Sequence, residues 1–404
     1  MSVRKRKWTT AKGEVREAWI VDYVDQHGRR LLKTFQRKKE ADAFADGART
    51  EVREGTHVGD SMSQTVAEAG AKWIASAEGA GLERATLDQY RQHLRLHIEP
   101  FLGRARLSRM TVPVVRDFED KLRAAGRSKK LTRYVVRSLG ALLSEAQEHG
   151  SIVRNPVREL RGKRRHKKDA SREGRGTKLK IGVDIPTPGE IRSILQAAQG
   201  RWRPFLLTAI FTGLRASELR GLRWTDIDFR KAELNVRQRA DRYRKIGKPK
   251  TEAGERTVPL PPMLVTALRE WKLRCPHGNL GLVFPNGVGG VEFHVNIIQR
   301  GLIPTLIAAG VTAPVLDKDG AHARDEAGKP MVTAKYPGLH ALRHFYASWC
   351  INRTQDGGLE LPAKIVQHRL GHSSITVTLD TYGHLFPNAD DGSELAAAEA
   401  ALLA

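Results

Sequence analysis

The segment His340-Ala341-Leu342-Arg343-His344 decides how the C-terminal half of this chain is organised. It lies in residues 338–353, where apolar residues recur at helical spacing and predict a helix. Positions i and i+3 share one face of a helix, so His340 and Arg343 are expected to point the same way. A single histidine on a helix is ordinarily a packing or surface residue, and this pair alone is only moderately specific for a site.

Two further clusters lie on either side of that helix. Upstream, the chain reads Thr212-Gly213-Leu214-Arg215-Ala216-Ser217-Glu218-Leu219, in which Glu218 follows Arg215 by about one helical turn. Taken alone this is an ordinary helix start with a local ion pair. Downstream, Leu370-Gly371-His372-Ser373-Ser374 is followed by Thr378-Leu379-Asp380-Thr381-Tyr382. Alone, Gly371 is typical of a helix C-cap and Tyr382 of a core tyrosine.

Around these clusters the pattern predicts a mainly helical domain. Thr187 and Glu190 have the spacing of a capping box that begins a helix. Helices are expected at residues 188–199, 202–213, 262–273, 293–309, 338–353 and 361–370. Strands are expected at 232–239 and 255–260, a polar insertion at 311–337, and a short Ala/Leu-rich helix at 393–404.

The N-terminal part of the chain shows two other patterns. Residues 15–24 and 30–35 are rich in β-branched and aromatic residues and predict strands, followed by a helix at 38–54. The next stretch predicts helices at 64–77, 82–98, 113–125 and 132–149, with Pro100 and Gly103 ending the second of these.

A basic segment separates the two halves. Residues 154–180 hold twelve lysines or arginines against three acidic residues and few large apolar residues. Such a stretch cannot pack a core and indicates a linker. A nuclear-targeting signal is a second interpretation, but a strap along a phosphate backbone is favoured.

The composition narrows the class of partner. Among 404 residues, 69 lysines and arginines face 45 acidic residues, and the formal charge of +24 favours a polyanion. No apolar run approaches the roughly 20 residues that span a bilayer. Cys275 and Cys350 are too few for a disulfide scaffold or a cysteine zinc site and fit a reducing cytoplasm. Nucleic acid is the first expectation, while a ribosome-associated or membrane-surface protein stays open on composition alone.

The order Arg215, then His340-x-x-Arg343, then Leu370-Gly371-His372, then Tyr382 resembles the tyrosine recombinases, specifically the phage-type integrases. The resemblance extends over nearly the whole chain. Residues 64–157 resemble the family's core-binding domain, including His97-Ile98-Glu99-Pro100-Phe101-Leu102-Gly103 and Asn155-Pro156. The N-terminal module resembles its arm-binding domain most loosely.

The resemblance implies a multidomain α+β fold. It comprises a small N-terminal module of a β-sheet plus a helix, an all-helical core-binding domain and a mainly helical catalytic domain with a small antiparallel sheet. The expected boundaries are 1–58 for the arm-type DNA-binding module, 64–160 for the core-binding domain, 161–185 for the basic linker, 186–391 for the catalytic domain and 392–404 for the tail helix.

The resemblance also implies a role for each site residue. Arg215 and Arg343 would clamp the scissile phosphate, His340 and His372 would complete its binding ring, and Tyr382 would be the nucleophile. Lys250, in Lys248-Pro249-Lys250-Thr251, matches the lysine that protonates the leaving oxygen. Lys245 and Lys248 compete for that assignment.

The physical chemistry of these residue types agrees. Two guanidiniums bind phosphate oxygens bidentately and stay charged at any working pH. A tyrosine with a pKa of about 10 is a poor nucleophile at pH 7 unless cations stabilise its phenolate. No carboxylate cluster indicates two-metal catalysis, so neither Mg²⁺ nor a cofactor is expected. The Asp226/Asp228 pair is interpreted as part of a turn.

The sequence therefore predicts a site-specific DNA integrase that acts in the cytoplasm of a bacterial host through a 3′-phosphotyrosyl intermediate. Its expected partners are double-stranded DNA attachment sites, three further copies in a tetramer on DNA, a host DNA-bending factor and a directionality factor, with no membrane. The residues expected to contact DNA are Arg91, Arg95, Arg133, Arg137, Lys163, Arg164, Arg165, Lys167 and Lys168. Two alternatives stay open, a nicking-closing topoisomerase and an inactive DNA-binding regulator or architectural protein.

Overall fold

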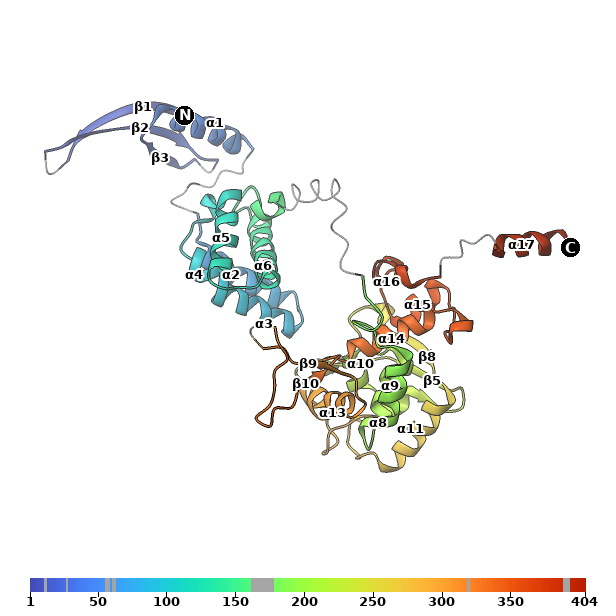
Figure 1. Ribbon diagram of the computed structural model, residues 1–404. Helices are drawn as coiled ribbons and strands as arrows, with labels where there is room; N and C mark the ends of the chain where they lie inside the picture. The colour runs from blue at the N-terminus through green and yellow to red at the C-terminus, as the bar shows by residue number, and fades with distance from the viewer. Residues whose placement is uncertain are drawn as a thin grey trace. The chain divides into compact units, whose positions relative to one another are not determined.

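The fold is described from a computed structural model that covers residues 1–10, 13–26, 28–54, 59, 63–160, 178–317, 320–387 and 393–404 (Figure 1). The chain divides into two compact units, Met1–Gly174 and Arg175–Ala404. The multidomain α+β fold class expected from the sequence is confirmed.

The first unit begins with an antiparallel sheet in the order β1 (Ser2–Thr9), β2 (Val15–Val24), β3 (Arg30–Phe35), followed by helix α1 (Lys38–Arg53). Strand β1 was not predicted, because its sequence is almost entirely polar and lacks the alternation of a half-buried strand. It pairs with β2 along its full length, and the pairing places Lys5 and Lys7 beside Glu17. Cross-strand ion pairs thus support this strand where apolar contacts are few.

Residues 63–160 of the first unit are mainly helical. Their helices are α2 (Val66–Gly79), α3 (Arg84–His93), α4 (Glu99–Leu102), α5 (Val112–Ala124) and α6 (Lys129–Glu148). A π-helical turn, Leu94–Ile98, joins α3 to α4. The expected stop at Pro100 is wrong, because the proline occupies the first turn of α4, where a missing N–H is tolerated. The helix ends at Leu102, before Gly103.

The second unit is mainly helical with small sheets. Its helices are α8 (Pro188–Ala197), α9 (Trp202–Thr212), α10 (Ala216–Gly221), α11 (Pro262–Arg274), α12 (His294–Asn296), α13 (Ile303–Ala308), α14 (His340–Ile351), α15 (Ala363–Leu370), α16 (Ile375–Tyr382) and α17 (Ser393–Leu403). A π-helical turn, Ile297–Leu302, separates α12 from α13. The capping box of Thr187 and Glu190 is present at the start of α8, as predicted.

In the described residues of this unit, the strands form one three-stranded sheet and two hairpins, all antiparallel. The sheet has the order β4 (Ile227–Asp228), β5 (Glu233–Val236), β8 (Arg256–Pro259). The hairpins pair β6 (Arg239–Ala240) with β7 (Ile246–Gly247), and β9 (Thr312–Pro314) with β10 (Val332–Ala334). The strand predicted at 232–239 is wrong as one element, because β5 ends at Val236 and Arg239 begins a separate hairpin.

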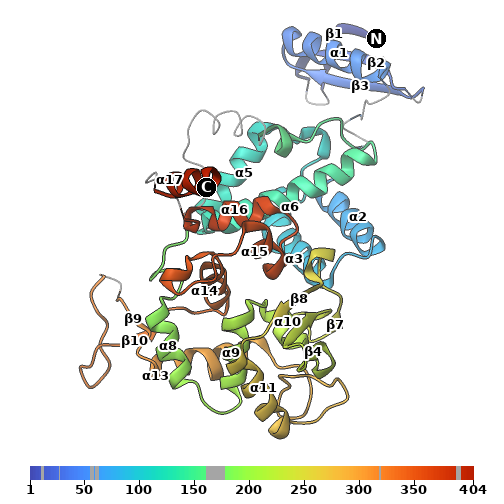
Figure 2. The same cartoon turned by 90° about the vertical axis from the view of Figure 1, so that its right-hand side faces the viewer.

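The core of the second unit lies around α9 and α14, which contact each other directly. Their inward faces are apolar, with Leu207 and Ile210 on α9 and Leu342 and Tyr346 on α14 all buried. Helix α15 packs against both α14 and α16 (Figure 2). The three helices therefore bring the C-terminal motifs to one side of the core.

Helix α16 was not predicted. Its sequence, from Ile375 to Tyr382, is dominated by β-branched residues that have low helix propensity. Packing against α15 and burial of Thr378 and Tyr382 overcome that preference. None of the helices in the described ranges is both long and apolar enough to cross a bilayer.

Gly213 connects the core to the residues that carry the motifs. It ends α9 in the left-handed conformation, with φ of 61°. A Cβ at this position would clash with the ring of Tyr346 on α14. Both the backbone angle and the close approach therefore require glycine here.

Replacing Gly213 with alanine is expected to destabilise the protein by about 3 kcal/mol, from left-handed strain and from overpacking against Tyr346. Gly200→Ala is the matched control, because Gly200 has φ of 53° but open space around its Cβ position. It should lose only about 1 kcal/mol. Urea unfolding of the two variants measures the difference, and equal losses would show that the Tyr346 contact is unimportant.

Candidate active site

Arg215 begins the site at the start of α10. Its backbone is extended, and its N–H donates to Glu218 Oε2 at 2.9 Å in a capping arrangement. The side chain turns back so that Nη1 donates to Glu218 Oε1 at 2.8 Å and Nη2 donates to the Gly371 carbonyl at 2.9 Å. The Arg215 side chain is 37% exposed, so its guanidinium is oriented yet open to a ligand.

A buried ion pair lies behind Arg215. The Glu218 carboxylate, 3% exposed, accepts from Nη2 of the fully buried Arg256 at 2.8 Å. Burial opposes ionisation, but the charge and hydrogen bonds of Arg256, with those of Arg215, lower the pKa of Glu218 to about 2. The carboxylate therefore stays ionised and holds both arginines.

Arg256 also joins two other parts of the chain. Its Nε donates to the Arg369 carbonyl at 2.8 Å, near the end of α15, and its Nη1 donates to the Gly254 carbonyl at 2.9 Å. Arg256 could not be identified from the sequence, because one arginine in a predicted strand gives no sign that it will be buried. Its guanidinium positions the segments that carry three of the motifs.

Arg343 is buried on α14, with its residue 2% exposed. Its Nη1 donates to the Gly213 carbonyl at 2.7 Å and its Nη2 donates to the Leu370 carbonyl at 2.5 Å. Burial and the nearby charge of Arg215 lower the pKa of Arg343 to about 9. Arg215 and Arg343 thus bind the consecutive carbonyls of Gly371 and Leu370, and their charges lie close together.

The two predicted histidines approach from different elements. His340 is exposed at the start of α14, three residues before Arg343 on the same helix. His372 follows Gly371, which caps α15 in the left-handed conformation with φ of 62°, as predicted for a C-cap. The Nδ1 of His372 is hydrogen-bonded to Thr378 Oγ1 at 2.9 Å. Burial and the arginines Arg343 and Arg215 lower its pKa to about 4, so His372 is neutral at pH 7.

Tyr382 ends α16 and is 1% exposed. Its ring lies nearly parallel to the His372 ring, with centroids 6.3 Å apart and an interplanar angle of 4°. Burial raises the pKa of Tyr382 to about 12, although Arg343 and Arg215 act to lower it. The phenol is therefore neutral and lies within the field of both arginines.

The Tyr382 hydroxyl is hydrogen-bonded to Nδ1 of His344 at 2.7 Å. His344 belongs to the first sequence motif, but no role was predicted for it. Its spacing held a signal, because a residue four positions after His340 shares that face of the helix. The rings of His340 and His344 are edge to face, with centroids 4.6 Å apart.

Lys250 is exposed in the loop between β7 and a short 3₁₀ turn, Glu252–Gly254. Arg256 anchors the end of that turn through the Gly254 carbonyl. Lys245 and Lys248 are exposed in the same region. The geometry does not separate the three lysines, and the assignment of Lys250 stays a prediction.

Asp226 and Asp228 both cap local backbone. Asp226 accepts from the Arg223 N–H at 3.0 Å, and Asp228 accepts from Arg230 and Lys231 N–H at 2.9 and 3.0 Å. These bonds support the interpretation of the pair as part of a turn. Within the described ranges, no cluster of three or more histidine, cysteine or acidic side chains could hold a metal ion.

The residues expected to contact DNA differ in their surroundings. Arg91 is paired with Glu78 and with Asp88, whereas Arg95 and Arg133 are exposed. Arg137 is exposed and lies 5.6 Å from the centre of the Tyr134 ring. The predicted strap residues Lys163, Arg164, Arg165, Lys167 and Lys168 lie outside the described residues.

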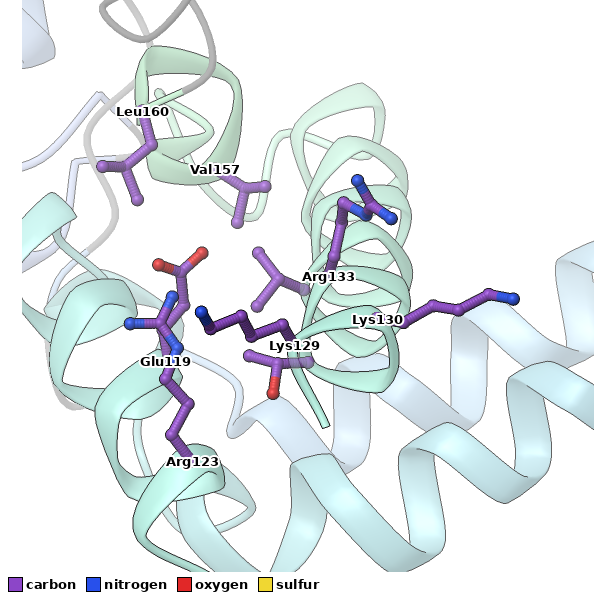
Figure 3. A pocket seen from close by; sticks show the side chains of 9 residues that line it. Glu119, Arg123, Lys129, Lys130, Arg133, Val157 and Leu160 are labelled. Carbon is purple, nitrogen blue, oxygen red and sulfur yellow. The ribbon is translucent and has the colours of Figure 1, made fainter. Parts of the chain in front are cut away.

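Arg133 lines a cavity of about 390 Å³ in the helical part of the first unit. Figure 3 shows Arg123 and Lys129 pointing toward this cavity together with Glu119, whereas Lys130 points away from it. Its remaining lining includes apolar side chains such as Val157 and Leu160. The cationic rim is suited to anions, but Glu119 provides an opposing charge.

The sequence model described as the phage integrase family matches residues 186–389, which is half of the chain. The chain therefore belongs to this family, whose members are tyrosine recombinases that break and rejoin DNA strands. A tyrosine recombinase XerC-like protein of Caldanaerobacter subterraneus subsp. tengcongensis is 28% identical over 384 residues, covering 90% of each chain. The ICEBs1 integrase of Bacillus subtilis is 23% identical over 300 residues, covering 72% of each.

Solved structures share the fold. The Tn1549 transposon integrase in complex with transposon right end DNA aligns with a TM-score of 0.61 at 21% identity, over 84% of this chain and 100% of that chain. A lambda integrase dimer bound to a COC′ core site aligns with a TM-score of 0.54 at 17% identity, over 95% of this chain and 97% of that one.

The buried ion pair predicts a pH-dependent stability. Glu218 ionises with a pKa of about 2 in the folded protein, below the ordinary value of 4.5. Its stabilising contribution is therefore complete above about pH 4.5 and is lost as the pH falls from there toward 2. Glu218→Gln should lose about 3 kcal/mol at pH 7, because Arg256 is then buried without a counter-charge.

Urea unfolding of the wild type and Glu218→Gln between pH 7 and pH 3 checks this. The difference in unfolding free energy should shrink at the acid end of that range. A difference that is small at pH 7, or constant with pH, would mean that the ionised carboxylate does not hold the site together.

Proposed function

We propose that this member of the phage integrase family is a site-specific integrase that inserts or excises a phage or another mobile element. Tyr382 attacks a DNA phosphate, which leaves a 3′-phosphotyrosyl link and a free 5′-hydroxyl. The 5′-hydroxyl of a partner strand then attacks that link and rejoins the DNA. The supporting observation is that Tyr382 lies in one corner of the unit with His372 and with the two arginines that bind consecutive carbonyls.

The arginines account for stabilisation of the transition state. Attack on a phosphodiester builds negative charge on its non-bridging oxygens. The guanidiniums of Arg215 and Arg343 are held in place before DNA binds, by Glu218 and by the carbonyls of Gly213, Leu370 and Gly371. Donors that are already oriented need no reorganisation during the reaction. In this proposal the phosphate oxygens replace some of the carbonyl partners.

The remaining site residues bind the phosphate and supply a proton to the leaving group. His340 and His372 donate hydrogen bonds to the phosphate, and Lys250 protonates the leaving 5′ oxygen from its exposed loop. The phosphotyrosyl link conserves the energy of the broken bond, so rejoining consumes no nucleotide. Side chains of this protein stabilise the negative charge that develops on the phosphate in the transition state. No proposed step requires Mg²⁺ or an organic cofactor.

The first unit and the linker supply DNA binding in this proposal. Residues 1–58 act as an arm-type module, residues 64–160 bind the core site, and residues 161–185 lie along the phosphate backbone. A DNA-binding surface is supported by three exposed arginines, Arg95, Arg133 and Arg137. Arg91 is less suited to bind a phosphate, because it is already paired with two carboxylates. The partners are double-stranded attachment sites in the cytoplasm of a bacterial host.

Joining two duplexes requires four active sites, so the proposed active form is a homotetramer on DNA. A lambda integrase of similar fold has been solved as a tetramer bound to a Holliday junction, with a TM-score of 0.50. Helix α17 exposes Leu395, Leu402 and Leu403, which would be covered by docking on a neighbouring subunit. A host DNA-bending factor and a directionality factor would set the path of the DNA and the direction of the reaction.

Removing the nucleophilic hydroxyl tests the proposal. Tyr382→Phe should abolish the covalent adduct with nicked suicide DNA while DNA affinity stays nearly unchanged, because one phenol adds little to a large ionic interface. Tyr346→Phe is the matched control, since Tyr346 is also 1% exposed in the same unit but is not assigned to the reaction. It should still form the adduct. Adduct formed by Tyr382→Phe would rule out Tyr382 as the nucleophile.

The arginine roles are tested by Arg215→Lys and Arg343→Lys. Lysine keeps the charge but loses the planar fork that binds two oxygens at once. Each variant should slow single-turnover cleavage on the order of 10²-fold or more, comparable to losing one oxyanion donor. DNA affinity, measured by electrophoretic mobility shift, should change far less. Near-normal cleavage by both variants would contradict the clamp.

A further inference from the structure

We propose that His344 is a catalytic residue that takes the phenol proton of Tyr382 at Nδ1 while the bond from Tyr382 to phosphorus forms. The inference rests on the proposed function and deepens it, since the reaction needs an acceptor for that proton. Nothing in the order of the family motifs assigned His344 a role. The 2.7 Å hydrogen bond between Nδ1 and the Tyr382 hydroxyl carries the inference.

Burial makes a protein acceptor necessary. Tyr382 is 1% exposed, so bulk water has little access to its hydroxyl. A buried phenol that becomes an ester must release its proton to a group already in contact with it. His344 lies at hydrogen-bonding distance, which is the geometric requirement for a general base.

The other groups near Tyr382 are less suited to this task. Arg215 and Arg343 donate hydrogen bonds and do not accept them. His372 stacks beside the Tyr382 ring, and its Nδ1 is already bonded to Thr378 Oγ1 at 2.9 Å. His340 lies one helical turn before His344 and contacts the His344 ring edge to face. The hydrogen bond to the phenol oxygen is made by His344.

The protonation state of His344 also fits. Burial, followed by the effects of His340 and Arg343, lowers its pKa to about 4, while Asp184 acts in the opposite direction. His344 is therefore neutral at pH 7 and can accept at Nδ1 when its own proton is on Nε2. Tyr382 faces it from α16 and keeps its proton in the free protein.

Binding of DNA would strengthen this base. In the free protein, the positive charge of Arg343 disfavours a charged imidazole at His344. A phosphodiester bound between Arg215 and Arg343 brings one negative charge that opposes this effect. An opposite charge nearby favours the protonated form of histidine. The arrangement thus keeps Tyr382 unreactive until a phosphate occupies the site.

The step balances in atoms and charge. The Tyr382 oxygen forms a bond to phosphorus, the bond from phosphorus to the 5′ oxygen breaks, and the phenol proton moves to Nδ1 of His344. The leaving 5′ oxygen takes a proton from Lys250 in the proposed reaction. During rejoining the oxygen of the incoming 5′-hydroxyl bonds to phosphorus and its proton returns to Lys250. The bond from phosphorus to the Tyr382 oxygen breaks, and the imidazolium of His344 returns its proton to that oxygen.

The test uses full-length His344→Asn and His344→Phe in single-turnover cleavage of nicked suicide DNA from pH 6 to pH 10. Asparagine can place an amide oxygen near the position of Nδ1 and keep the hydrogen bond, but it cannot take the proton. His344→Asn should cleave on the order of 10²-fold more slowly than wild type at pH 7, the size of a general-base contribution. Its rate should recover as rising pH ionises the phenol. The control His384→Asn alters a nearby histidine bonded to the Leu179 carbonyl and should behave as wild type.

A role limited to positioning predicts a different result. His344→Asn would then cleave within a few-fold of wild type and keep the wild-type pH profile, while His344→Phe alone would be slow. That outcome would overturn the proposal. The charged and titratable groups that face His344, and therefore influence the pH dependence of its protonation, are His340 and Arg343 on α14, Asp184 and Tyr382.

A bypass reaction shows whether the rest of the site is intact. In a Tyr382→Phe background, a DNA strand ending in a 3′-(4-nitrophenyl) phosphate is joined to a 5′-hydroxyl strand without any phenol to deprotonate. Adding His344→Asn should leave this joining within about threefold, whereas adding Arg343→Lys should impair it on the order of 10²-fold. Loss of joining with His344→Asn would show a structural role and would overturn the proposal.

The two proposals fail in distinguishable ways. If wild type forms no adduct and the Tyr382→Phe protein joins no activated strand, the proposed function itself is wrong. If both reactions proceed and His344→Asn matches wild type at every pH, only the assignment of His344 is wrong.

Discussion

The buried ion pair between Glu218 and Arg256 is the interaction on which the site depends. Glu218 fixes Arg215, and Arg256 reaches the Gly254 carbonyl beside the Lys250 loop and the Arg369 carbonyl near His372. Segments more than 100 residues apart in sequence are therefore held by one guanidinium and one carboxylate. Buried pairs of this kind add little net stability, but loss of one partner leaves a costly isolated charge. The pair thus fixes the geometry more than it adds to stability.

The free site is electrostatically incomplete. Arg343 is buried among carbonyl partners, with Arg215 near enough to lower its pKa to about 9. Burial keeps the Tyr382 phenol protonated, and His344 and His372 are neutral at pH 7. A bound phosphodiester would supply the missing negative charge and change the balance of each group at once. In the proposed reaction, this change would allow a tyrosine with a raised pKa to act as the nucleophile.

Much of this could be predicted from the sequence, because the motifs are local and strongly patterned. Helical spacing placed His340 and Arg343 on one face, and Gly371 was identified as a C-cap. What failed depends on tertiary contacts. The polar strand β1 is supported by cross-strand ion pairs, and α16 is a helix despite its β-branched residues. Arg256 and the contact between His344 and Tyr382 join residues distant in sequence, and no periodicity reports such contacts.

In the proposed reaction, this corner of the second unit forms a covalent bond to the 3′ end of a broken DNA strand through Tyr382. The most direct measurement is mass spectrometry of the proteolysed adduct trapped on nicked suicide DNA, with the polarity of the attached strand determined in parallel. We expect a nucleotide remnant on Tyr382, linked through a 3′-phosphate. A remnant on any other residue, or a 5′-phosphate linkage, would contradict it.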